Sequence, residues 1–351
     1  MTTDRELDEF LDLLKILIRE PSVVGAEYPF FRVLRRELDE SGAQVTQYQG
    51  VLVAQGRRPR SCVLSAHIDR HGLVCTGPNE FQYAVYVSQH QGYETGDSIS
   101  AQMAGSIRER FRDQRVHAYD PWSGAYIGQG VIERAYLCPL RENFVFEVEG
   151  LEHLRAGTPV AYLDRLQVGG ESISGQLDNV LSVAMVVHAF RRGYQGTALF
   201  TAEEEAGKSW QHALAWFKRK QWDTQRLIML DTSPYPDRAS ADAQEIVLRR
   251  KDAYGTFDAG LVGELEAACK DLGLRAGFKD AFVEAQNVQR IRQGLAPGSL
   301  GRTELGRLVS ATGGRINGST LQFPTIGYHT STETASLASV RGMLALVGSI
   351  F

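Results

Sequence analysis

The stretch SCVLSAHIDRHGLV, residues 61–74, opens with a short apolar run and gathers its polar side chains at the end. The apolar run predicts a buried strand. Ligands of open α/β sheets collect beyond the carboxyl ends of the strands, so His67 and Asp69 stand where a site is expected. Strand alternation puts both on one face, together with His71. We expect Asp69 to orient the His67 imidazole, and His71 to line the pocket or serve structure rather than bind metal.

The same pattern, an apolar strand that runs into a polar side chain, recurs three times. TALFTA leads into the acidic turn at 203–207, LIML leads into Asp231, and FPTIGY leads into His329. After Asp178, the apolar stretch VLSVAMVVHAFRR predicts a helix. Strand, helix and strand therefore alternate, which predicts an α/β fold with a doubly wound, mostly parallel sheet.

Residues 76–170 differ from the rest of the chain in their residue composition and in their hydrophobic pattern. They contain many glycines and short alternating segments such as YAVYV and NFVFEVEG, which predict a small β-rich domain. A charged amphipathic helix is expected within it at about 99–112. We therefore expect a core formed by 1–75 and 171–351, with the β-rich domain inserted between its halves.

The composition favours a folded, water-soluble protein without nucleic-acid partners. A hydrophobic fraction of 43% with 23% charged residues is ordinary for a globular chain, and residues 4–19 and about 26–40 predict amphipathic helices. The net charge of −4, with no basic run, argues against nucleic acid. The four cysteines form no CxxC pair, which favours reduced thiols. No apolar run of ~18 residues and no secretory signal pattern is visible, so we expect a cytoplasmic protein without a membrane partner.

Glu203, Glu204 and Glu205 place like charges side by side, which is costly unless a cation neutralises them. One carboxylate can bind a metal while its neighbour takes a proton from water. A solvated acidic turn is the alternative. Each candidate ligand is weak alone, but several such positions, each at the end of a strand or the start of a helix, together favour a metal site.

These segments resemble those of the tetrahedral aminopeptidases, a family of two-zinc exopeptidases that includes glutamyl and deblocking aminopeptidases. AHIDRHGLV is similar to the family's His-x-Asp strand, and GQLDNVLSVAMVV to its bridging-aspartate segment. EEAG is similar to its Glu-Glu-x-Gly motif, MLDTS to the strand of a further ligand, and GYHTSTETAS to its closing histidine segment. The resemblance covers nearly the whole chain and implies a zinc-exopeptidase-like fold.

The resemblance also implies the activity: a metal-dependent aminopeptidase that releases N-terminal amino acids from small peptides. It makes Glu204 the general base and Asp69 a supporting catalytic residue. Two divalent ions per chain are implied, with Zn²⁺ as the first expectation and Co²⁺ or Mn²⁺ also suited to nitrogen and oxygen ligands. The implied ligands are His67 and Asp231 for the first ion, Glu205 and His329 for the second, and Asp178 for both.

The position of the insert separates this family from related deacylases. Here the long insertion falls between His67 and Asp178, as in the tetrahedral aminopeptidases, whereas deacylases carry theirs between the last two ligands. The family also implies a homo-oligomer, with a dodecameric cage as its known form. The expected helix at 99–112 is unusual for the insert.

Two segments depart from the family's pattern and leave the substrate open. The chain reads Gly-Arg302-Thr-Glu304 where the family has Gly-Gly-Thr-Asp, and Gly-Tyr328 where it has Arg-Tyr. One alternative is therefore a two-metal hydrolase of N-acyl amino acids or dipeptides. A non-catalytic assembly subunit with a structural metal is another, but such a site needs no general base, and Glu204 argues against it.

Overall fold

A large sheet forms the centre of the molecule in the computed structural model, which describes residues 2–90, 101–138, 144–163 and 165–350. Four neighbouring strands, in the order β12-β3-β13-β16, run parallel, and they are the four expected from the sequence. Most flanking strands pair antiparallel, whereas the two short strands at 246–248 and 276–278 pair with each other in parallel. The sheet contains β1 (Gln44–Tyr48), β2 (Val51–Gln55), β3 (Val63–His67), β10 (Gln167–Gly169), β11 (Ser172–Gly175), β12 (Thr197–Thr201), β13 (Thr224–Pro234), β14 (Ile246–Leu248), β15 (Ala276–Phe278), β16 (Ile316–Ile326) and β17 (Glu333–Ser336).

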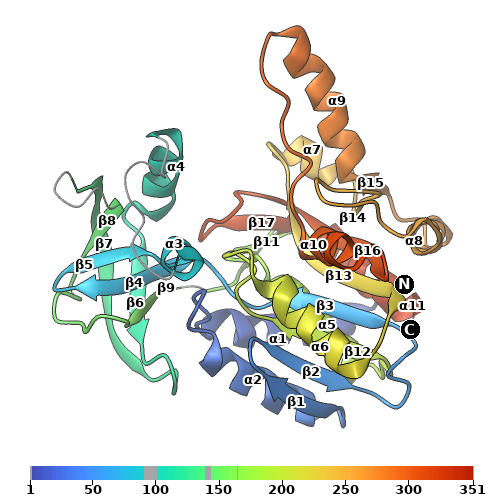
Figure 1. Cartoon of the computed structure of the whole chain (residues 1–351), viewed down its shortest axis with the longest axis horizontal. Coiled ribbons are helices and arrows are strands. Elements are labelled where there is room, and N and C mark those ends of the chain that lie inside the picture. Colours follow the sequence, from blue (N-terminus) through green and yellow to red (C-terminus); the bar gives the residue numbers. More distant parts are fainter. Residues whose placement is uncertain (1, 91–100, 139–143, 164, 351) are drawn as a thin grey trace.

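Helices cover both faces of this sheet, and each face has its own apolar core (Figure 1). Along β3, Leu64 and Ala66 join the core under α1, α2, α5 and α11, while Val63 joins the core under α6 and α10. No helix in the described parts of the chain is long and apolar enough to cross a membrane. The helices packed on or beside the sheet are α1 (Asp4–Arg19), α2 (Tyr28–Asp39), α5 (Val180–Arg191), α6 (Ser209–Lys220), α7 (Arg238–Asp242), α8 (Ala259–Asp271), α10 (Glu304–Thr312) and α11 (Leu337–Ile350). Helix α9 (Lys279–Arg292) projects away from the sheet and is buried only at its first two residues (Figure 1).

A closed barrel with a separate apolar core stands to one side of the sheet (Figure 1). Its strands follow the order β4-β5-β8-β7-β6-β9. The barrel strands lie within 72–162, whereas β10 already belongs to the large sheet; that the barrel is a separable domain over 76–170 stays a prediction. The segment contains β4 (Gly72–Gly77), β5 (Glu80–Tyr83), α3 (Ala84–His90), α4 (Ala101–Phe111), β6 (Arg115–Tyr119), β7 (Tyr126–Leu137), β8 (Phe144–Glu149) and β9 (Pro159–Tyr162).

Most elements lie where the sequence predicts them, including α1, α2, α5 and α4, although residues 99 and 100 fall outside the described residues. Two details differ. YAVYV was expected as a strand, but Ala84 begins a helix whose consecutive Val85 and Tyr86 are both buried in the barrel core. A short apolar run of this kind does not distinguish strand from helix. In addition, β13 continues beyond Asp231 to Pro234, because β16 extends its pairing there.

Candidate metal centre

His67 and Asp69 lie at the carboxyl end of β3, as the sequence predicts. His67 is the last residue of the strand, and the Asp69 side chain is completely buried. The Asp69 carboxylate accepts the backbone N–H groups of Glu204 and Glu205, each at 2.9 Å, and lies 3.5 Å from Nδ1 of His67. Asp69 thus joins the histidine to the acidic turn after β12 and leaves Nε2 of His67 free to face other carboxylates.

Asp178 lies between two histidines just before α5 begins. Its Oδ1 is 3.2 Å from Nε2 of His67, and its Oδ2 is 3.3 Å from Nε2 of His329. The backbone N–H of Asp178 donates to Oε2 of Glu333 at 3.0 Å, which fixes the segment. One carboxylate therefore faces two imidazoles that come from distant parts of the chain.

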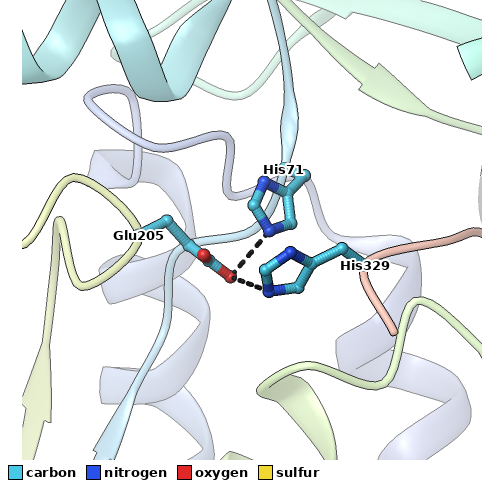
Figure 2. A group of neighbouring side chains, drawn as sticks. All are labelled: His71, Glu205 and His329. Atoms are coloured by element: carbon cyan, nitrogen blue, oxygen red, sulfur yellow. Dashed lines mark ion pairs between the residues drawn. The ribbon is translucent and has the colours of Figure 1, made fainter. Parts of the chain in front are cut away.

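Asp231 and Glu205 complete two neighbouring groups of donors. Oδ1 of Asp231 is 3.5 Å from Nε2 of His67. On the other side, Oε1 of Glu205 is 3.5 Å from Nε2 of His329 and 3.0 Å from Nε2 of His71 (Figure 2). His329 follows β16 in a turn and has a φ of 61°. The structure thus brings the five expected ligands together and adds His71 to them.

The electrostatics of this centre favour a bound cation. Burial raises the pKa of Glu204 well above its usual range, raises that of Glu205 to about 8, and raises that of Asp231. Burial also opposes ionisation of Asp178, yet the neighbouring His329 and His67 imidazoles lower its pKa. Several carboxyl groups so close together resist losing their protons unless a positive charge offsets them.

The donor atoms also have the chemistry and placement that a metal needs. Within the described residues, His67, Asp178 and Glu205 form one group that could hold an ion, and His71, Glu205 and His329 form another. Ligand atoms in each group lie within 4.8 Å of one another. Oδ1 of Asp178, Oε1 of Glu205 and Nε2 of His329 are buried without a hydrogen-bond partner. Buried polar atoms are normally satisfied, so these residues fit a metal centre.

Glu203 faces away from this centre. Its Oε1 accepts hydrogen bonds from the Ser88 hydroxyl at 2.8 Å and from Nζ of Lys208 at 3.2 Å, and its Oε2 lies 3.2 Å from Nε2 of His212. The hydrogen bond with His212, together with those from Ser88 and Lys208, lowers the pKa of Glu203 to about 2. Of the three consecutive glutamates, Glu204 and Glu205 therefore remain as candidates for the metal centre.

Glu203→Gln is expected to cost stability and to leave metal binding unchanged. The carboxylate's pKa is lowered from 4.5, so its stabilisation is fully present above about pH 4.5 and is lost as pH falls through about 2. With the discount for partial exposure, we expect the variant to unfold ~1–2 kcal/mol more easily at neutral pH. Denaturant unfolding at several pH values measures this. A difference that persists undiminished at the acid end would contradict it.

The two segments that depart from the family's pattern take different positions. Glu304 is buried at the start of α10, where its Oε2 accepts the Thr201 hydroxyl at 2.9 Å. It therefore supports the end of β12 next to the acidic turn. Arg302 lies at the surface, with its guanidinium carbon 5.8 Å from the centre of the Tyr254 ring. The Tyr328 ring stacks on His329 at 3.5 Å between ring centres.

One participant was missed from the sequence. Glu333 is completely buried, and its two oxygens accept the Asp178 N–H and the Thr325 hydroxyl, at 3.0 and 2.7 Å. It holds the shared carboxylate in place through the backbone. The signal was its place in the closing histidine segment, four residues after His329.

Comparison with known proteins gives a clear result at the level of structure alone. No protein-family model matches the sequence, and no curated protein matches it. Solved structures match along nearly the whole chain. The aminopeptidase APDkam598 from the archaeon Desulfurococcus kamchatkensis has a TM-score of 0.71 at 14% identity, covering 98% of this chain and 94% of that one.

Two structures of TET1 peptidases agree. A dodecameric structure of PhTET1 gives a TM-score of 0.70 at 16% identity, over 97% of this chain and 98% of the other. The Pyrococcus horikoshii TET1 peptidase, which can assemble into a tetrahedron or a large octahedral shell, gives 0.67 at 16% identity over the same shares. At these identities the likeness establishes the fold, and the chain shares the fold of the tetrahedral aminopeptidases.

Proposed function

We propose that this chain is an aminopeptidase that uses two divalent ions to release N-terminal amino acids from peptides. The observation that carries the proposal is the position of Asp178, whose two oxygens face His67 and His329 on opposite sides. A carboxylate so placed suits a bridge between two ions. The fold supports the same reading, because its solved neighbours include proteins named aminopeptidases.

The proposed ligands follow the contacts among the donor atoms, in which Asp231 lies 3.5 Å from Nε2 of His67. His67 and Asp231 hold the first ion, Glu205 and His329 hold the second, and Asp178 is shared. Zn²⁺ is the ion that mixed imidazole and carboxylate ligands suit first, with Co²⁺ and Mn²⁺ as further candidates. The sheet covered by helices on both faces then corresponds to the doubly wound sheet of a zinc exopeptidase.

Glu204 acts as the general base in this proposal. When bound, the two ions supply Lewis acidity that polarises the scissile carbonyl and acidifies water. Glu204 takes a proton from the attacking water as its oxygen bonds to the carbonyl carbon, and returns it to the amine as the C–N bond breaks. Asp69 holds the backbone N–H groups of Glu204 and Glu205, and so keeps the base in position.

Paired substrates that differ only at the N-terminus test the proposal. An amino-acid amide with a free α-amine and its N-acetylated partner should be compared on the metal-reconstituted protein. We expect hydrolysis of the free-amine member and little of its partner, because a site built for an amine leaves polar groups unpaired when an amide replaces it. Preference for the acetylated member would favour the N-acyl amino acid hydrolase, and no turnover of either would favour a non-catalytic subunit.

A homo-oligomer is also proposed, supported by the dodecamer of PhTET1 and the tetrahedron of the Pyrococcus horikoshii TET1 peptidase. The barrel carries large exposed apolar side chains, with Trp122 at 70% and Tyr126 at 62% exposure, which suit contact with another copy. The mass of the particle in solution, measured by light scattering, decides this.

A further inference from the structure

His71 occupies a position that the proposed ligand set does not use. It lies between β3 and β4 and is only 2% exposed. Its Nε2 is 3.0 Å from Oε1 of Glu205, an oxygen that is also 3.5 Å from Nε2 of His329 (Figure 2). All three atoms are buried without a hydrogen-bond partner. Two imidazole nitrogens therefore converge on one carboxylate oxygen.

The spacing of these atoms is that of ligands around one ion. Bonds of about 2.0–2.2 Å to a tetrahedral zinc place neighbouring nitrogen and oxygen ligands about 3.3–3.5 Å apart. The separations of 3.0 and 3.5 Å around Glu205, and of 3.3 Å between His329 and Asp178, lie near this value. A small adjustment of side chains would admit the ion.

The His71 ring is held in this orientation through its other ring nitrogen. Its Nδ1 is hydrogen-bonded to the Tyr83 hydroxyl, whose oxygen also accepts from a guanidinium nitrogen of Arg110 at 3.0 Å. The backbone oxygen of His71 accepts from the Gln176 side chain at 2.8 Å. Metal-binding histidines are usually oriented by such a partner on the other ring nitrogen. Tyr83 therefore directs Nε2 of His71 toward Glu205.

We propose that His71 is a fourth protein ligand of the second ion, beside Asp178, Glu205 and His329. The inference rests on the proposed two-metal function and deepens it. The second ion would then have four protein ligands, two of them imidazoles. The first ion would have three protein ligands, His67, Asp231 and the shared Asp178, and so the more open coordination of the two.

The two sites consequently differ in chemistry. Two imidazoles at the second site favour Zn²⁺ or Co²⁺ over Mn²⁺, because nitrogen donors suit the former ions better than the latter. The second ion should also bind more tightly and leave more slowly than the first.

Titration of the metal-free, full-length protein with Co²⁺ tests the inference without an activity assay. Four-coordinate Co²⁺ absorbs visible light much more strongly than five- or six-coordinate Co²⁺. The wild type should therefore show a strong band as its tighter site fills. His71→Gln should weaken this band. It should also lower the affinity of the site for Co²⁺ by more than ~10–100-fold, which is the usual cost of losing a residue that only orients a metal ligand.

Two further variants complete the test. Tyr83→Phe keeps the imidazole but removes the hydroxyl that orients it, and should give a smaller loss in the same direction. His117→Gln replaces a buried histidine of β6 in the barrel and should leave titration and spectrum unchanged. If His71→Gln binds two ions with wild-type affinities and spectrum, the inference is overturned. If the wild type itself fails to bind two ions, the proposed function fails instead.

Discussion

Glu204→Gln is expected to lower turnover by at least ~10²–10⁴-fold while both ions stay bound. Glutamine keeps the volume of the side chain but cannot accept the proton of the attacking water. The backbone N–H of Glu204, which donates to Asp69, is unaffected, so the acidic turn should keep its shape. A loss of this size raises the activation free energy by ~3–5 kcal/mol. Steady-state kinetics and metal analysis of the same sample measure the two properties together.

Glu205→Gln is the matched control for this variant, since it makes the same chemical change one residue later. Oε1 of Glu205 faces His329 and His71, so its loss should weaken the second ion selectively. Activity should then partly return at high metal concentration, which Glu204→Gln should not allow. Should Glu204→Gln lose an ion while Glu205→Gln keeps both, the two roles would have to be exchanged.

The parallel centre of the fold could be predicted because its strands are buried on both faces. Short apolar runs such as VLSA and LIML are typical of such strands, and the polar residue after each run marked the end where a site forms. The flanking antiparallel strands were not predicted. Short, half-exposed strands such as β10 depend on their neighbours for pairing, and that information is not local.

The candidate centre was predictable only as far as each residue carries its own local signal. His67 and Glu204 stand at the ends of apolar runs, but Glu333 has no such mark, because its role depends on a contact with Asp178 far away in sequence. His71 was expected to line the pocket. Its contact with Glu205 depends on how the chain turns between the sheet and the barrel, and side-chain parity along a strand cannot show this.

Removal of metal is expected to abolish hydrolysis, and Asp178→Asn is expected to weaken both ions at once. Each oxygen of Asp178 faces a different histidine. Replacing the carboxylate with a neutral amide therefore removes a negative charge from both proposed sites. The affinity of each site for its ion should fall by more than the ~10–100-fold that removing a residue that only orients a ligand costs. Metal analysis after reconstitution should approach two ions per wild-type chain and fall well below one for the variant.

Asp258→Asn provides the control for this change, because Asp258 caps α8 by accepting the Leu261 N–H at 2.8 Å, and asparagine caps a helix equally well. It should bind two ions as the wild type does. Asp178→Asn keeps the backbone N–H that donates to Glu333, so its metal-free form should unfold at nearly the wild-type temperature. A fully active wild type that holds a single ion would contradict the shared site. So would Asp178→Asn binding two ions with wild-type affinity, since no other described carboxylate lies between His67 and His329 in this way.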